Sequence, residues 1–204
     1  MEPNSLWIYA LLVAGIIALP GMDMAFVAAS GLAGGARQGA AALAGIVAGG
    51  AVHMAVGLLG LGLLLQASPW LFNAVLLGGA LYMAWLGWPL LRHGPALVAE
   101  GAGGPAESVW RTALRGLLTC LLNPKAYVFC VTVLPAYLTR EPLRALALAG
   151  ITASAQLLLY GLVLWAALRG RQRFAASPWL ARAVGLLLLT TALLALGQGW
   201  RSLT

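Results

Sequence analysis

Charged side chains are scarce in this sequence. Lysine, arginine, aspartate and glutamate make up 8% of its 204 residues, whereas hydrophobic residues make up 62% and the mean hydropathy is +0.92. A soluble globular chain carries about a quarter charged residues, so this composition excludes an ordinary soluble domain. The hydrophobic excess predicts an integral membrane protein, and the length allows six transmembrane spans of about 20 residues joined by short loops.

The residue types that enzymes and metal sites need are also few. The chain has one aspartate, two histidines and two cysteines, whereas an intramembrane aspartyl protease needs two aspartates. It contains neither a His-Glu-x-x-His metal motif nor a Gly-x-Ser-x-Gly nucleophile turn. Cys120 and Cys130 match no zinc spacing, so we expect both to be small buried hydrophobic residues. The sequence therefore predicts a protein that is not an enzyme and that holds no metal or other cofactor.

Lysine occurs once, at Lys125, inside an apolar stretch that runs from 117 to 138. A fixed charge in a membrane segment is costly without a partner or a water-filled cavity, so it marks a functional site by default. Asn123 is a favoured helix N-cap, and Pro124 suits the first turn of a helix. The segment therefore predicts a helix that is interrupted at 123 and restarts with its positive end exposed.

The first apolar run, 6–29, contains a comparable interruption. Pro20 removes a helical hydrogen bond to Ile16, and Gly21 loosens the same turn. Asp23, the only aspartate, follows directly. Two charges of opposite sign thus stand beside two predicted helix breaks.

The interrupted runs 6–29 and about 112–138 are the first and fourth predicted spans. Four further spans are predicted at 40–65, 70–91, 143–168 and 179–200, with polar breaks at 31–39 and 92–111 and a basic loop at 169–173. In the second span Gly45, Gly49 and His53 share one helix face, and small residues there allow close helix packing. His53 is either a packing residue or part of a transport pathway. In the fifth span Thr152, Gln156 and Tyr160 form a stripe that either lines a cavity or only makes interhelical hydrogen bonds.

The two halves of the chain resemble each other. The segment 67–71, Ala-Ser-Pro-Trp-Leu, returns at 176–180, and each half begins with a helix broken at a proline. Because each half has three spans, the second copy must be inverted relative to the first, as in many secondary transporters. We expect an all-α, polytopic membrane domain over 1–204 with six transmembrane helices. It comprises repeat one (1–91), a linker (92–111) and an inverted repeat two (112–204).

The net charge of +7 sets the expected orientation. The segments after spans one, three and five hold eight arginines: Arg37, Arg92, Arg111, Arg115, Arg169, Arg171, Arg173 and Arg182. The opposite side holds three: Arg140, Arg144 and Arg201. Arginines are retained on the cytoplasmic side, so the linker is expected there, with both termini on the other, periplasmic side. Within a bilayer this charge gives no reason to expect nucleic acid as a partner.

The segments 20–23 (Pro-Gly-Met-Asp), 34–37 (Gly-Gly-Ala-Arg) and 122–125 (Leu-Asn-Pro-Lys), with His53 and the stretch 82–87, resemble the LysE/RhtB family of bacterial amino-acid exporters. The resemblance covers essentially the whole chain, although Met22 stands where the family often has a second proline. It implies export of amino acids or related small metabolites across the bacterial inner membrane, coupled to the proton gradient by antiport.

The repeat and the resemblance together suggest a substrate site at mid-membrane. We expect Lys125 and Asn123 at the restarted helix to attract a substrate carboxylate, because helix N-termini favour anions. Asp23 would bind the ammonium or take up a proton, and Gln156 would contribute a polar group. The remaining pathway or helix-break residues are Pro20, Gly21, His53, Pro124, Thr152 and Tyr160.

Several alternatives stay open. Asp23 and Lys125 could form only a structural salt bridge, and the protein could be a channel or an exporter of another small solute or cation. The face with Gly45 and Gly49 could pack within one chain or between two, which leaves a homodimer open.

Overall fold

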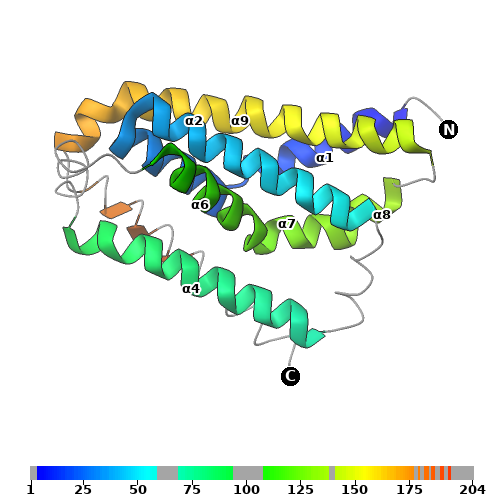
Figure 1. Cartoon of the computed structure of the whole chain (residues 1–204), viewed down its shortest axis with the longest axis horizontal. Helices are drawn as coiled ribbons and strands as arrows, with labels where there is room; N and C mark the ends of the chain where they lie inside the picture. Colours follow the sequence, from blue (N-terminus) through cyan, green and yellow to red (C-terminus); the bar gives the residue numbers. More distant parts are fainter. Residues whose placement is uncertain are drawn as a thin grey trace.

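The computed structural model describes residues 4–58, 69–93, 108–137 and 141–176, and isolated positions between 179 and 193. All regular elements of this described part are helices (Figure 1). They are α1 (Asn4–Ala18), α2 (Met22–Leu58), α4 (Pro69–His93), α6 (Val109–Leu121), α7 (Pro124–Val128), the π-helix η1 (Phe129–Val133), α8 (Leu134–Tyr137) and α9 (Pro142–Ala176).

The first predicted break is present between α1 and α2. Pro20 has no N–H group to continue the helix. The last hydrogen bond before it spans only three residues, from Leu19 N to Ile16 O at 3.3 Å. The chain resumes as a helix after Gly21, whose carbonyl accepts from Ala25 N at 3.0 Å. Asp23 therefore lies in the first turn of α2, where a negative charge is favoured by the helix dipole.

α2 consists of two helical arms, 22–34 and 36–58, that join at Gly35. Gly35 has φ 74° and ψ −166°, and it is the one residue with positive φ in the described part of the chain. A side chain is disfavoured in that conformation, so glycine is needed here. The chain turns back sharply, because a Cβ placed on Gly39 would lie only 3.1 Å from the Cα of Gly31. The predicted polar break at 31–39 is therefore not a loop but a one-residue turn between helical arms.

The second predicted break is also present. α6 ends at Leu121, and Asn123 then caps α7 through its side-chain oxygen, which accepts from Lys125 N at 3.0 Å. Pro124 occupies the start of α7, as the sequence predicts. Beyond α7 the helix widens into η1, where Leu134 N–H donates to Phe129 O five residues earlier.

The second arm of α2 packs backbone against backbone on α6. A Cβ on Gly45 would overlap the carbonyl oxygen of Ala113, and one on Gly116 would overlap the carbonyl oxygen of Ala42. A Cβ on Gly49 would lie 2.6 Å from the Cβ of Cys120. The small-residue face predicted in the second span is thus a helix–helix contact within the chain.

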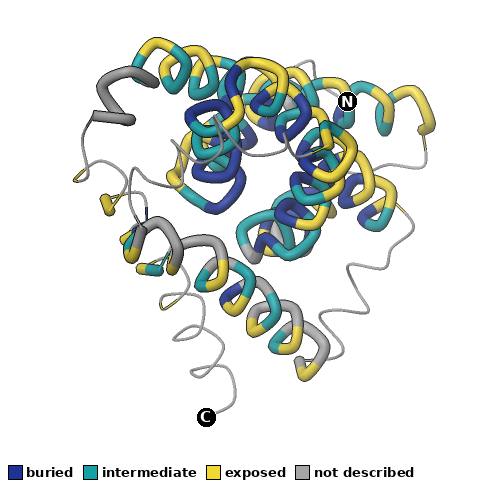
Figure 2. Tube along the Cα trace, turned by 60° about the vertical axis from the view of Figure 1, so that its left-hand side comes forward, coloured by how far each residue is buried: buried dark blue, intermediate teal, exposed yellow. Residues whose placement is uncertain are grey.

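α9 runs along the other side of α2 and also contacts α1 (Figure 1). It continues to Ala176, so the predicted basic loop at 169–173 is wrong. The reason is local: arginine and glutamine favour helix, and a single glycine, Gly170, does not end it. The common core between these helices is formed by buried side chains from α1, α2, α6, η1, α8 and α9 (Figure 2).

By length and composition alone, Met22–Leu58 and Pro142–Gly170 are apolar enough to cross a membrane, although the first turns back at Gly35, and Leu6–Ala18 is a shorter apolar helix. Helices thus occupy the described residues of the first five predicted spans, with 59–65 of the second span outside the described part. Most of the predicted sixth span, 179–200, and the linker positions 94–107 lie outside the described residues. α4 lies to one side of the other helices (Figure 1).

Candidate functional site

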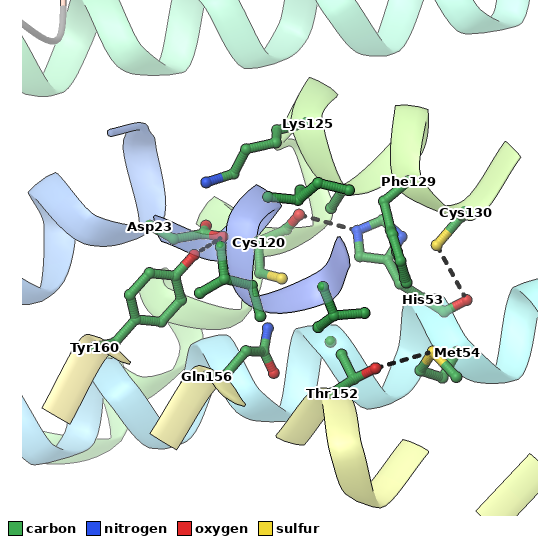
Figure 3. Close-up of a pocket in the computed structure, with 15 residues that line it drawn as sticks. Asp23, His53, Met54, Cys120, Lys125, Phe129, Cys130, Thr152, Gln156 and Tyr160 are labelled. Carbon is green, nitrogen blue, oxygen red and sulfur yellow. Dashed lines mark hydrogen bonds between the residues drawn. The ribbon is translucent and has the colours of Figure 1, made fainter. Parts of the chain in front are cut away.

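A cavity of about 50 Å³ lies where the two broken helices meet α9 and the second arm of α2 (Figure 3). By this measure about 10–15 Å³ holds one water molecule, so the cavity has room for a few. Six of the residues singled out in the sequence line it: Asp23, His53, Lys125, Thr152, Gln156 and Tyr160. The structure therefore brings together polar residues from four segments that are distant in the sequence.

Lys125 connects the two helix breaks. Its Nζ donates a hydrogen bond of 2.9 Å to Leu19 O, a carbonyl at the break before α2. A Cβ on Gly21 would lie 3.5 Å from the same Nζ, so the glycine leaves room for the ammonium. The cation thus satisfies a backbone oxygen at the interruption of α1 and α2.

Asp23 faces the same part of the cavity but forms no ion pair with Lys125 within 4.0 Å (Figure 3). Its Oδ2 accepts a hydrogen bond of 3.3 Å from the hydroxyl of Tyr160. Its Oδ1 is buried and has no hydrogen-bond partner. A resting salt bridge, one of the readings open from the sequence, is therefore not formed in this conformation.

Asn123 and Gln156 each also have one buried polar atom without a partner. Asn123 caps α7 through its Oδ1, and its Nδ2, next to the Asp23 carboxylate, has no hydrogen-bond partner. Gln156 rests on Gly50, and its Oε1 makes none. With exposed fractions of 3% for Asp23, 2% for Asn123 and 6% for Gln156, these side chains are almost fully removed from solvent. Buried polar atoms ordinarily find a partner. Asp23 and Gln156 line the cavity, which makes it the candidate ligand site, whereas Asn123 lies beside Asp23 outside the lining.

His53 holds the second arm of α2 against α6. Its Nε2 lies 3.0 Å from Cys120 O. A carbonyl oxygen only accepts, so Nε2 carries the proton in this contact. The ring also packs edge-on against Tyr127, with centroids 4.8 Å apart. His53 thus packs between helices and also lines the cavity, and its part in a transport pathway stays a prediction.

Tyr9 does not line the cavity but supports it through Thr152, and no residue pattern singled it out beforehand. Its hydroxyl lies 2.7 Å from Thr152 Oγ1, and Thr152 itself donates to Leu148 O at 3.0 Å. Tyr9 is therefore the donor in the first contact, which joins α1 to α9. A usable signal was the four-residue spacing of Tyr9, Val13 and Ile17, which are all buried on one face of α1.

The rest of the lining is apolar or weakly polar. It includes Ile17, Met54, Cys120, Phe129 and Cys130. Both cysteines are free and buried, in line with their expected role as small hydrophobic residues. Asp23 and Lys125 are the charged residues of the described lining, so one negative charge balances one positive charge.

Comparison with known proteins assigns a family. The family described as LysE type translocator matches residues 14–199. The threonine efflux protein of Escherichia coli (strain K12) is 36% identical over 121 residues, which cover 56% of this chain and 58% of that protein. The leucine efflux protein of Enterobacter sp. (strain 638) is 35% identical over 130 residues, which cover 62% of this chain and 60% of that protein.

The aligned region thus spans about three-fifths of each of these relatives' own length. No solved structure matches the chain significantly. The family match, in contrast, extends over nearly the whole sequence and includes both helix breaks. This membrane protein therefore belongs to the LysE type translocator family.

Proposed function

We propose that the protein exports neutral amino acids across the bacterial inner membrane by alternating access. One observation carries this proposal: two buried acceptor atoms without partners belong to residues that line a single cavity, and a buried donor atom without a partner lies beside one of them. The acceptors are Asp23 Oδ1 and Gln156 Oε1, and the donor is Asn123 Nδ2. An α-amino acid offers the complementary set, because its ammonium donates and its carboxylate accepts.

The charges of the cavity orient such a ligand. The ammonium would be held by Asp23 and Gln156, and the carboxylate by Asn123 Nδ2 and Lys125. Lys125 would exchange its bond to Leu19 O for the stronger, charge-assisted bond to a carboxylate. The apolar lining, including Ile17 and Phe129, would face the substrate side chain.

The balance of charge favours a neutral amino acid over a cationic one. A zwitterion leaves the pair Asp23 and Lys125 compensated, whereas a basic side chain would bring an uncompensated positive charge into an apolar site. The names of the relatives, threonine and leucine efflux protein, agree with this class. Small neutral amino acids are therefore the substrates that we propose.

Proton coupling would use the same carboxylate. Asp23 is the acidic residue in the described lining, and it cannot bind a proton and an ammonium equally well at once. Substrate release on one side would leave the carboxylate free to take up a proton for the return. The cavity of about 50 Å³ is small, so loading requires an opening movement.

We further propose that the chain has six transmembrane helices in two inverted repeats. Reciprocal hydrogen bonds support this: His53 in the second span bonds the fourth, at Cys120 O, while Tyr160 in the fifth bonds the first, at Asp23. The arginine-bearing ends of α4 and α9 also lie at one end of the bundle (Figure 1). This end would face the cytoplasm, with both termini periplasmic. A homodimer stays a further proposal.

Transport into inside-out membrane vesicles tests the export proposal. We expect saturable uptake of labelled threonine or leucine that depends on an imposed pH gradient, with little uptake of labelled lysine. Asp23→Asn and Lys125→Met should each lower uptake at least about tenfold, because each removes a charged hydrogen-bond partner of the substrate. Gly161→Ala is the matched control, since a Cβ there meets nothing within 4 Å and transport should be unchanged.

The variants also discriminate the alternatives. If the double variant Asp23→Asn/Lys125→Met regains transport, the two charges serve only to neutralise each other. A channel would give electrical currents that do not saturate and would not support counterflow of labelled substrate. Uptake that does not depend on the pH gradient would contradict proton coupling but would leave the export proposal intact.

A further inference from the structure

The cavity is polar at one end and mostly apolar at the other. Asp23, Lys125 and Tyr160 lie at the polar end, where Tyr160 donates to the Asp23 carboxylate. On α9, Thr152 lies two turns before Tyr160, about 12 Å along the axis, and its Oγ1 is 3.9 Å from Met54 Sδ. Figure 3 shows Asp23 and Tyr160 on one side of the cavity and Met54 on the other. An amino acid held by its ammonium and carboxylate at the polar end would extend its side chain towards Thr152 and Met54.

Tyr9 organises this second end from behind the cavity wall. Its hydroxyl lies 2.7 Å from Thr152 Oγ1 and 3.8 Å from Met54 Sδ, and its ring centroid lies 6.0 Å from that of Phe129. All three partners line the cavity, whereas Tyr9 itself is fully buried outside the lining. One buried ring thus contacts three lining side chains, which come from α2, η1 and α9.

The hydrogen-bond donors at this end are already used. The Thr152 hydroxyl donates to Leu148 O at 3.0 Å, so its oxygen can only accept from any further group. The Tyr9 hydroxyl donates to that same oxygen. The thioether of Met54 is a weak acceptor, and Phe129 has no polar atom in its side chain. These side chains therefore present acceptors and carbon to the cavity, and none of them presents a free donor.

We propose that Thr152, Met54 and Phe129 form the subsite for the substrate side chain, which admits aliphatic and hydroxylated amino acids and rejects those with a side-chain amide or carboxylate. This subsite rests on the export of amino acids proposed above. An aliphatic chain needs no partner there, and a hydroxyl can donate to Thr152 Oγ1. An amide or carboxylate oxygen would be buried without a donor, which lowers affinity by about tenfold or more. The Cys130 thiol, also in the lining, does not supply one, since it donates to His53 O at 3.6 Å.

The alternative is that Gln156 reads the side chain through its amide nitrogen. Its amide lies against Gly50, because a Cβ there would be 2.5 Å from Oε1 and 2.7 Å from Nε2. Gly50 lies one turn before Met54 on α2, and Gln156 lies one turn after Thr152 on α9, which is about 6 Å along each helix. The amide is thus held between the two ends of the cavity, closer to the main-chain groups of the substrate than to the tip of its side chain.

Competition between amino acids of matched shape tests the subsite. Against uptake of labelled leucine into inside-out vesicles, asparagine should inhibit at least about tenfold more weakly than unlabelled leucine, and glutamine more weakly than methionine. Threonine and valine should inhibit within about fivefold of each other, because the threonine hydroxyl finds an acceptor. Asparagine that inhibits as strongly as leucine would overturn the subsite and favour a reading by Gln156.

The variant Met54→Gln adds the missing donor with little change in size. The ratio of the inhibition constants for leucine and asparagine should shift at least about tenfold in favour of asparagine. Met24→Gln makes the same change at a partly buried methionine outside the lining and should keep the ratio. Because the ratio compares two inhibitors on one variant, it does not depend on how much of the protein folds. An unchanged ratio in Met54→Gln would contradict the subsite.

Thermal unfolding of the full chain in dodecyl maltoside micelles separates binding from transport. Saturating leucine should raise the unfolding midpoint by roughly 3–5 °C, and asparagine at the same concentration should raise it much less. This difference without any uptake would contradict export and support the subsite. Uptake with equal inhibition by the two amino acids would support export and overturn the subsite. Neither uptake nor a difference in midpoint would overturn both.

Discussion

Gln156 reaches the cavity because Gly50 has no side chain. A Cβ at position 50 would lie 2.5 Å from Gln156 Oε1 and 2.7 Å from its Nε2, so the amide would have to move. If Gln156 binds the substrate ammonium, Gly50→Ala should lower transport several-fold, mainly through a higher KM, with little change in the thermal midpoint. Gly150→Ala, where nothing lies within 4 Å, is the control. Unchanged transport in Gly50→Ala would show that Gln156 has no part in binding.

Asn123 has two separable groups: its Oδ1 caps α7, and its Nδ2, buried beside Asp23 without a partner, is the proposed donor to the substrate. Serine is also a good N-cap but has no amide donor. We therefore expect Asn123→Ser to keep stability and lose transport, whereas Asn123→Ala should lose transport and about 1 kcal/mol of stability. Unfolding midpoints and vesicle uptake, measured on both variants, check this. Full transport by Asn123→Ser would mean that the amide serves the helix alone.

At the level of single residues, much of the cavity could be predicted and some of it could not. Asp23, Lys125 and Gln156 were predictable, because burying a polar side chain in an apolar membrane segment is energetically costly and therefore marks a functional position. Phe129 was not, since aromatic residues are ordinary in membrane helices. The spacing of Tyr9, Val13 and Ile17 indicates a buried face of α1 but not the bond from Tyr9 to Thr152. The bond from Lys125 to Leu19 O also could not be foreseen, because it depends on how two distant helix breaks meet.

Among the helices, the contact between α2 and α6 is the most sensitive to substitution. Gly45→Ala would drive a Cβ into the backbone of α6, at the carbonyl of Ala113 and 2.9 Å from Leu117 N. Backbone cannot rotate away as a side chain can, so we expect a loss of about 1–3 kcal/mol and a lower unfolding midpoint. Gly161→Ala in α9 meets nothing within 4 Å and should be neutral. Equal midpoints for the two variants would contradict the packing described here.

The boundaries of the helices show which local signals suffice. The breaks at Pro20 and at 123–124 were predictable, because proline removes a backbone donor wherever it stands. The helix through Arg169 was missed because charge suggested a loop, although arginine is a good helix former. The π-helical turn of η1 has no recognisable sequence signal. Its residues are apolar and equally compatible with an ordinary helix.

For the molecule as a whole, the proposed orientation can be tested by labelling. In a background without Cys120 and Cys130, we expect Arg37→Cys, next to the Gly35 turn, to react with an impermeant thiol reagent only from the cytoplasm. Leu143→Cys, exposed at the start of α9, should react only from the periplasm. The two positions lie at opposite ends of the bundle, so each serves as the control for the other. The reverse pattern would invert the orientation.

The contact of α2 with α6 also determines which parts can slide. Gly45, Gly49 and Gly116 bring two backbones together with no intervening side chains that could change rotamer. Neither backbone can slide past the other by rotamer changes, so we expect the second arm of α2 and α6 to move together as one rigid body. α9, in contrast, is tied to α1 and α2 by hydroxyl bonds from Tyr9 and Tyr160, which can break and re-form singly. We therefore expect relative motion of the helices to occur at the interface between α9 and the rest of the bundle, beside the cavity.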